Sequence, residues 1–245
     1  MPLRARRPLV ALALALALGA WAGVAPAAAP ASATTTTTTT TPAFTLADTW
    51  LLKAIGSEAK VGSVHIDGTI TQGTTSISLS LVVNGDGEGG GTLTLSGSLI
   101  RLKRVGPLLY FNAPKKFWVA HAPAAEARSY GGKWIEVSAL DARFSSFDQF
   151  LNVEDLVTAV FQGHSTPLTV SGPRRYRHQP VMIVADTSTV QGKTSTGRMY
   201  VAARGTSFVL KIVDRTPTQS GTILFSHYTK AVSITIPPEP INLAS

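Results

Sequence analysis

The segment VHIDGTITQGTTSISLSLVVNGDGEGGGTLTLSGSLIRLKRVGPLLYF, residues 64–111, decides the fold. Apolar and polar residues alternate through three successive runs of this segment. Side chains of a β-strand point alternately to its two faces, so the alternation predicts strands with one dry and one wet face. The turn Gln72-Gly73 and the glycine-rich segment 84–91 separate the runs, and neighbouring strands are expected to pair as antiparallel hairpins.

The rest of the chain adds more strands and two helices. Thr45 and Asp48 have the spacing of a capping box and begin the first helix. Apolar residues at helical spacing predict a second helix over 152–162, whereas 115–128 has no clear period. Further strands are predicted at about residues 99–104, 108–111, 133–137, 167–171, 175–186, 197–203, 207–213, 221–227 and 231–236.

These elements define the predicted fold class as α+β. A sheet of about ten or eleven one-faced strands curls because of its twist, and no alternation of strands with helices suggests a parallel sheet. The prediction is a single curved antiparallel half-barrel sheet whose concave face is covered by the two helices.

The chain begins with an export signal. Residues 1–33 combine a basic start, an apolar run and the small-residue cleavage site Ala31-Ser32-Ala33. Residues 34–43 form a threonine-rich linker that cannot bury apolar surface. We therefore expect one half-barrel domain over 44–240, followed by a tail at 241–245.

Composition narrows the chemistry. The chain has no cysteine, which excludes disulfides and thiolate metal sites. Without residues 1–33 it carries 19 basic and 14 acidic side chains, a formal net charge of +5. This charge suits an anionic envelope surface or anionic lipid headgroups, and no aromatic-plus-basic motif of RNA-binding modules accompanies it.

No catalytic, metal or cofactor site is predicted. The five histidines have no metal-ligand spacing, and there is no G-x-S-x-G nucleophile motif. Gly85-Asp-Gly-Glu-Gly-Gly90 fits G-x-G-x-x-G, but a strand follows where a dinucleotide fold requires a helix. It is predicted to be a hairpin loop, with calcium binding through Asn84, Asp86 and Glu88 as the alternative.

The order of motifs resembles a known family. The features that carry the resemblance are the glycine-rich hairpin before Gly91-Thr-Leu-Thr-Leu, the run 101–111, Phe117-Trp118, Gly132-Lys-Trp134, the helix at 152–162, Gly197-Arg-Met-Tyr-Val-Ala, Leu224-Phe-Ser-His-Tyr and Ile236-Pro. Together they resemble the LolA-like superfamily, in its LppX and LprG branch of actinobacterial lipid-binding envelope lipoproteins. The resemblance implies a half-barrel that carries acyl chains of envelope lipids and has no catalytic residues. Members are usually anchored through a lipobox cysteine, which this chain lacks.

The predicted function is therefore a monomeric carrier of a lipid or lipoglycan, either secreted to the cell envelope or held in the membrane by its signal. The alternative is a non-catalytic structural or interaction module whose core is filled by its own side chains. Arg175 and Arg177 are proposed as a patch for lipid headgroups or transient contact with an anionic membrane, against the alternative of a charged edge strand. The residues expected to line an acyl-chain cavity are Leu51, Ile55, Leu79, Leu81, Leu93, Leu95, Leu156, Val160, Val201 and Phe225.

Overall fold

The structure is a computed structural model that describes residues 45–122, 124–141, 144–159, 167–190 and 193–243. Within these ranges twelve strands form one open sheet in the order β12-β6-β5-β4-β3-β2-β1-β11-β10-β9-β8-β7. The strands are β1 (Ser63–Gln72), β2 (Thr75–Asn84), β3 (Gly89–Leu95), β4 (Ser98–Val105), β5 (Leu108–Asn112), β6 (Trp134–Ser138), β7 (Thr169–Tyr176), β8 (Gln179–Val190), β9 (Lys193–Ala202), β10 (Val209–Arg215), β11 (Gln219–Thr229) and β12 (Ile241–Asn242). The helices are α2 (Leu46–Glu58), α3 (Lys115–His121), α4 (Ala124–Tyr130), α5 (Ser145–Asp148), the 3-10 turn η1 (Gln149–Leu151) and α6 (Val153–Ala159).

The sheet consists of two meanders that meet in its middle. β1 to β6 pair successively along the chain, and so do β7 to β11. β1 then pairs with β11, residues 63–72 lying against 219–229. All these pairs are antiparallel, which confirms the predicted hairpins, and only β12 runs parallel to its neighbour β6.

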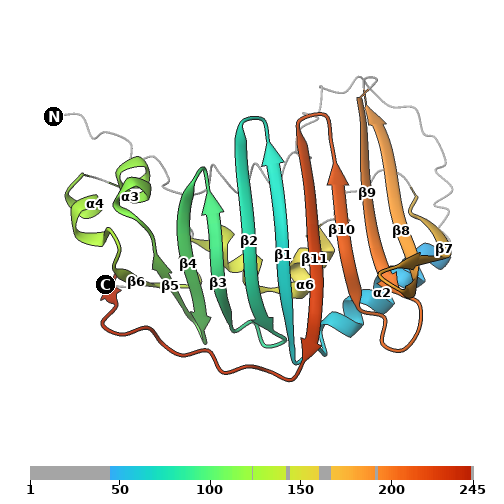
Figure 1. The fold of residues 1–245 in the computed structure, drawn as a ribbon, viewed down its shortest axis with the longest axis horizontal. Coiled ribbons are helices and arrows are strands. Elements are labelled where there is room, and N and C mark those ends of the chain that lie inside the picture. The colour runs from blue at the N-terminus through green and yellow to red at the C-terminus, as the bar shows by residue number, and fades with distance from the viewer. Residues whose placement is uncertain (1–44, 123, 142–143, 160–166, 191–192, 244–245) are drawn as a thin grey trace, which may run out of the picture.

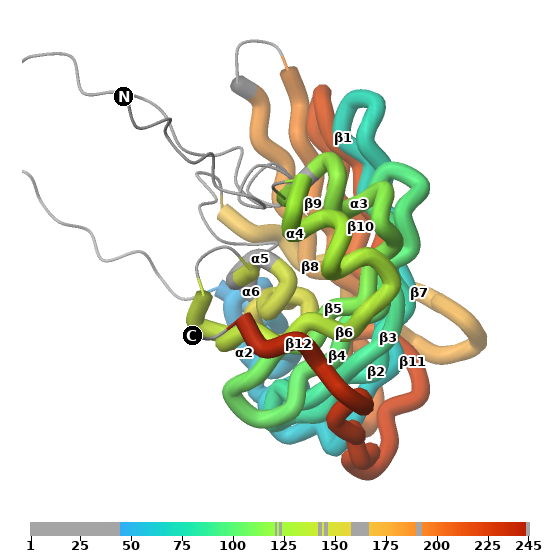
Figure 2. The backbone as a smooth tube through the Cα atoms, turned by 90° about the vertical axis from the view of Figure 1, so that its left-hand side faces the viewer, coloured from blue at the N-terminus to red at the C-terminus, as the bar shows by residue number. Residues whose placement is uncertain are grey.

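Helices cover one face of the sheet. Figures 1 and 2 show α2, α5 and α6 together on one side, which we call the inner face, while α3 and α4 lie at the end of the sheet near β5 and β6. The opposite, outer face bears no helix in the described part of the chain (Figure 2).

Alternation in the strands decides which side chains fill the core. The apolar members of each strand lie on the inner face, and their polar neighbours, such as Ser78 and Thr94, lie on the outer face. Buried inward residues from across the sheet join one hydrophobic cluster, which includes Ile66, Leu81, Leu93, Leu102, Leu109, Ile135, Met199, Ile212 and Phe225. The prediction of one dry face is therefore confirmed.

The number of elements differs from the prediction. The sheet has twelve strands rather than ten or eleven, and one pair is parallel. The segment 115–128 forms α3 and α4, and α5 precedes α6, so the expectation of two helices was wrong. α3 and α4 are each seven residues long, too short to show a helical period that a reader of the sequence could recognise.

The predicted strand 175–186 was also wrong. The chain turns at Arg177 and His178, which both have positive φ, and separates β7 from β8. Conversely, Gly172-Pro173, which lies between the predicted strands 167–171 and 175–186, is inside β7, where the pairing with β8 shifts register.

The predicted strand 231–236 is absent from the sheet. Residues 230–243, which we call the C-terminal strap, instead run along one end of the sheet from β11 to β6 (Figure 1). Asn84 holds Val232 through two hydrogen bonds, and Lys103 Nζ donates to the Thr235 carbonyl at 2.8 Å. Residues 241–242, expected to belong to a tail, form β12.

The predicted signal and linker lie outside the described residues. None of the helices that the structure describes is both long and apolar enough to cross a membrane.

Candidate functional site

The residues predicted to line a cavity gather on the inner face. Seven of them are buried in the hydrophobic cluster: Leu79, Leu81, Leu93, Leu95, Leu156, Val201 and Phe225. Leu51 and Ile55 of α2 are partly buried against that cluster, and Val160 lies outside the described residues. The sequence thus identified side chains that share one apolar layer.

The inner-face helices differ in how they pack. From α5 to α6 the chain buries large apolar side chains in the cluster: Phe147, Phe150, Leu151, Val153, Leu156 and Val157. The ring of Phe111 on β5 lies 5.0 Å, centroid to centroid, from the rings of both Phe144 and Phe147. Each buried side chain of this size contributes roughly 1.5–3 kcal/mol. This half of the cover is firmly attached to the sheet.

α2 is attached differently. Its buried residues are Ala47, Ala54 and Glu58, two small side chains and one carboxyl. Leu46 and Leu52 are 62% and 55% exposed. α2 therefore buries no large apolar side chain completely, and Trp50, Leu51 and Ile55 pack against the cluster while remaining partly exposed. Thr45 and Asp48 form the predicted capping box at its start.

A buried polar contact fixes the end of α2. Glu58 is 1% exposed, and its Oε1 accepts the backbone N–H of Val209 at 2.8 Å. The hydroxyl of Tyr228 on β11 lies 3.0 Å from the same oxygen and also contacts the carbonyl oxygen of Val209. The Tyr228 ring stacks on Phe208 at 4.0 Å. One carboxyl group thus joins α2 to both β10 and β11.

The number of hydrogens available for the contacts of the Tyr228 hydroxyl indicates that the Glu58 carboxyl is protonated. The Tyr228 hydroxyl has one hydrogen but two oxygen neighbours, Glu58 Oε1 and the Val209 carbonyl. A proton on Glu58 supplies the missing hydrogen, so both contacts become hydrogen bonds. Burial raises the pKa of Glu58 to about 7, against the lowering effect of its bonds to Val209 and Tyr228.

A polar pocket of about 170 Å³ lies beside this carboxyl. It is bounded by the end of α2, the β2–β3 turn and the start of α6, and is lined mainly by polar groups, including Glu58, Asn84, Arg104 and Glu154. Such walls do not suit an acyl chain. The pocket is therefore distinct from the apolar layer predicted to hold lipid.

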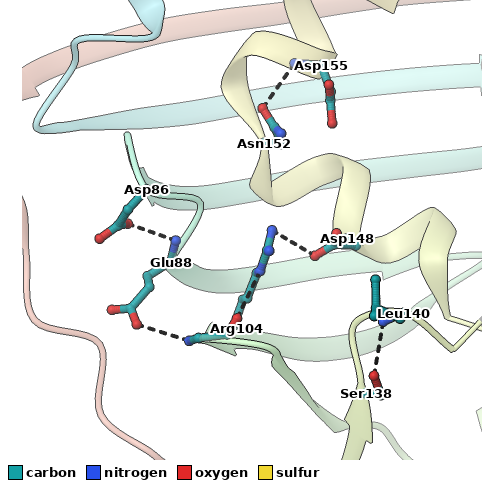
Figure 3. Close-up of polar contacts among 9 residues, drawn as sticks. Asp86, Glu88, Arg104, Ser138, Leu140, Asp148, Asn152 and Asp155 are labelled. Atoms are coloured by element: carbon teal, nitrogen blue, oxygen red, sulfur yellow. Dashed lines mark hydrogen bonds and ion pairs between the residues drawn. The ribbon is translucent and has the colours of Figure 1, made fainter.

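Arg104 organises the polar contacts around this pocket (Figure 3). Its Nη1 lies 3.1 Å from Oδ1 of Asp148, and its Nε donates to the carbonyl of Gly106. Burial raises the pKa of Asp148, while Arg104 opposes that shift. The ion pair joins β4 to the end of α5 on the inner face.

The β2–β3 loop does not assemble a metal site. Glu88 Oε1 accepts the N–H of Gly106 at 3.0 Å, and the amide of Asn84 is bonded to Val232 (Figure 3 shows the Glu88 contact). Within the described ranges, no three His, Asp or Glu side chains are placed to share a metal ion.

The two predicted patch residues lie at the β7–β8 hairpin, and both are exposed. Arg175 is in β7 opposite Pro180, and Arg177 is in the turn. The guanidinium carbon of Arg177 lies 5.5 Å from the centroid of the Tyr176 ring. In a continuous strand over 175–186, Arg177 and Tyr176 would point to opposite faces, but the turn folds the arginine over the ring.

Sequence reasoning missed Glu58, Tyr228 and Arg104. The sequence pattern contained a sign of two of these residues, Arg104 and Glu58. Arg104 continues the inward series of Ile100 and Leu102 on β4, and Glu58 lies on the same helical stripe as Ala54. Tyr228 had no such signal, because its partner comes from a distant part of the chain.

Comparisons with known proteins were made at the levels of sequence and structure. No family model and no curated protein matches the chain. Among solved structures, LprF from Mycobacterium bovis is similar at 14% identity and a TM-score of 0.47, covering 79% of this chain and 97% of that one. The lipoprotein LppX from Mycobacterium tuberculosis is similar at 11% identity and a TM-score of 0.48, covering 76% and 97%. At these identities the similarity concerns the fold alone.

Proposed function

We propose that the protein binds the acyl chains of a lipid or lipoglycan between the inner face of the sheet and helix α2, and carries out no chemistry. The observation that carries the proposal is the unequal attachment of the cover. α5 to α6 are fixed by large side chains that are fully buried, whereas α2 fully buries only two alanines and one carboxyl, and its Trp50, Leu51 and Ile55 are only partly buried. A carrier needs one wall that moves, and α2 is the wall with the least apolar area to lose.

The apolar layer provides what an acyl chain requires. Each methylene transferred from water to dry walls gains about 0.8 kcal/mol, and no polar partner is needed. If α2 moves outward, Leu51 and Ile55 remain available on its side, and Val201 and Phe225 belong to the apolar layer on the sheet. Exported or signal-anchored placement in the envelope belongs to the same proposal.

A second function is favoured by a specific observation. Leu81 and Leu93 are each 1% exposed and Phe225 is 2% exposed, so the protein's own atoms already surround them. This burial suits a structural or interaction module with a self-filled core.

Lipid content separates the two functions. The protein should be purified from a bacterial host with a cell envelope, analysed by native mass spectrometry, and extracted with organic solvent. A carrier is expected to show a bound lipid mass. A clean polypeptide mass, also after incubation with lipid extract, would overturn the carrier and support the module.

Two neighbouring leucines provide a matched test of the binding place. Leu51→Gln adds a polar group on the half-buried side of α2, whereas Leu52→Gln makes the same change at an exposed position. We expect the Leu51 variant to retain less than about a tenth of the bound lipid, since losing apolar contact worth roughly 1.5 kcal/mol corresponds to tenfold in affinity. The Leu52 variant should retain nearly all of it. Equal retention in both would show that lipid does not lie against α2.

A further inference from the structure

Charge is distributed unevenly over the sheet. Residues 168–229, which include β7 to β11, contain eight lysines and arginines but only two acidic residues, Asp186 and Asp214. Asp186 is opposite Gly197 on β9, and Gly197 is opposite Asp214 on β10. Both aspartates therefore share a face with buried Met199, and that is the inner face.

The outer face of β7 to β10 consequently has basic side chains without carboxylates among the described residues. Tyr200 and Lys211 are opposite each other on β9 and β10, and exposed Arg198 lies two residues before Tyr200 on the same face. By register the nearest outer carboxylate is Asp67, two strands from Lys211, and it lies 3.7 Å from His65. The charge on this face is uncompensated.

Two tyrosines hold the cations in place. The rings of Tyr176 and Tyr200 lie 5.4 Å apart, centroid to centroid. Lys211 Nζ lies 5.6 Å from the Tyr200 centroid and 5.9 Å from the Tyr176 centroid, and Arg177 covers Tyr176 from the turn. Cations at such distances are attracted to the ring faces. We call Tyr176, Arg177, Tyr200 and Lys211 the tyrosine platform.

The position of the platform suits a flat partner. Figure 2 shows the β7–β8 hairpin projecting from the sheet on the side away from α2, α5 and α6. A planar surface can therefore meet the hairpin and the outer face without touching the helices. Tyrosine favours the boundary between water and an apolar phase, because its ring is apolar and its hydroxyl is polar.

We propose that the tyrosine platform docks the protein on an anionic phospholipid membrane through the outer face of β7 to β10. Lys211, Arg177 and the exposed arginines Arg174 and Arg198 meet the phosphates, while the two tyrosines lie at headgroup level. This docking deepens the lipid-carrying function proposed above and rests on it for its purpose. It leaves the inner face and α2 free to exchange cargo.

Vesicle co-sedimentation tests the proposal. The probe is the purified full chain with vesicles of equal parts phosphatidylglycerol and phosphatidylcholine, and with phosphatidylcholine alone. Binding is expected only to the anionic vesicles and should weaken as salt is added. Arg177→Glu with Lys211→Glu is expected to weaken it at least 30-fold, since each basic residue near such a surface contributes about 1 kcal/mol.

A matched variant controls for net charge. Arg101→Glu with Lys116→Glu makes the same change of charge at two exposed positions away from β7 to β10. It is expected to weaken binding less than about threefold, because it leaves the platform intact. Equal weakening by both pairs, or no binding of the unaltered protein, would overturn the proposal. If soluble dextran sulfate binds as tightly as the vesicles and displaces them, the surface is a polyanion site instead and the proposal fails.

Further measurements separate loss of docking from loss of folding and from loss of bound lipid. Far-ultraviolet circular dichroism checks that the Arg177/Lys211 variant is folded, and Arg174→Ala with Arg198→Ala removes two exposed charges of the outer face without changing the rings. This second pair should also weaken vesicle binding at least tenfold. The lipid content of each variant is measured in parallel, so loss of docking with cargo retained distinguishes this proposal from failure of the carrier function.

Discussion

Glu58 shows how one residue can link helix and sheet. Its side chain belongs to α2, but its hydrogen-bond partners are Val209 and Tyr228 from the other meander. With Glu58 neutral, both oxygen contacts of the Tyr228 hydroxyl are hydrogen bonds, whereas a carboxylate leaves one of these contacts without a hydrogen. The protonation state of Glu58 therefore affects how well α2 is held.

The stability of the protein is expected to depend on pH through this residue. The pKa of Glu58 is about 7 in the folded protein and 4.5 when unperturbed. The stabilising contribution of the protonated form is complete below pH 4.5 and is lost as pH rises through 7. The free energy of unfolding should fall across this window by an amount of order 3 kcal/mol.

Glu58→Gln isolates this contribution, because glutamine has the same shape and does not titrate. Chemical denaturation of both proteins between about pH 5 and pH 8 measures the difference in their free energies of unfolding. The variant should be the more stable of the two at the upper end of this range, since it carries no buried charge. A difference that stays constant with pH would show that Glu58 is already ionised in the fold.

At the scale of elements, the connection from α2 to β1 is set by a glycine. A Cβ at Gly62 would lie 2.4 Å from the carbonyl oxygen of Thr229 and 2.8 Å from the amide nitrogen of Ala231. Both are backbone atoms of β11 and the strap, which cannot rotate away. Gly56, six residues earlier, lies within α2 and a Cβ there would meet nothing within 4 Å.

These two glycines should respond oppositely to alanine. Gly62→Ala is expected to destabilise the protein by roughly 2 kcal/mol or more, because the backbones of β1 and β11 must separate. Gly56→Ala is expected to stabilise it by up to about 1 kcal/mol, since alanine is the better helix former. Thermal or urea denaturation measures both, and the same sign for the two variants would contradict the close approach at Gly62.

The elements also show where sequence patterns suffice. Alternation predicted β1 to β3 because one face of each strand is dry and the other wet. The sequence did not predict the β7–β8 turn, because Arg177 and His178 adopt positive φ and no glycine marks the turn. The strap was mistaken for a strand because Val232, Ile234 and Ile236 alternate, yet its described bonds to the sheet around Val232 and Thr235 come from the side chains of Asn84 and Lys103.

The candidate site shows the same limit. Period-two and helical patterns located the apolar layer, since they depend only on neighbours along the chain. The contact of Glu58 with Tyr228 spans 170 residues and has no local pattern. The tyrosine platform likewise depends on the register of β7 to β10, which places Tyr176, Tyr200 and Lys211 on one face only after the sheet has formed.

At the scale of the whole molecule, the strap connects the middle of the sheet to one edge. It leaves β11 at Lys230, whose carbonyl accepts Ser63 Oγ at 2.8 Å, and ends beside β6. There Asn242 Nδ2 donates to Glu136 Oε1 at 2.8 Å, and the N–H of Leu243 donates to the Glu136 carbonyl at 2.9 Å. Tyr110 on β5 is opposite Glu136 and is 1% exposed although it lies on the outer face.

Removing the end of the strap should therefore loosen the edge of the sheet at β5 and β6. Truncation after residue 236 deletes β12 and the two bonds to Glu136. At about 1 kcal/mol for each of the two hydrogen bonds, we expect the free energy of unfolding to fall by roughly 2 kcal/mol. Truncation after residue 243 keeps these contacts and is the matched control.

Hydrogen exchange should show faster exchange in β6 than in the central pair β1 and β11, because only the edge loses a neighbour. Unchanged stability in the shorter protein, or equal exchange in β6 and β1, would mean that the strap lies on the sheet without supporting it.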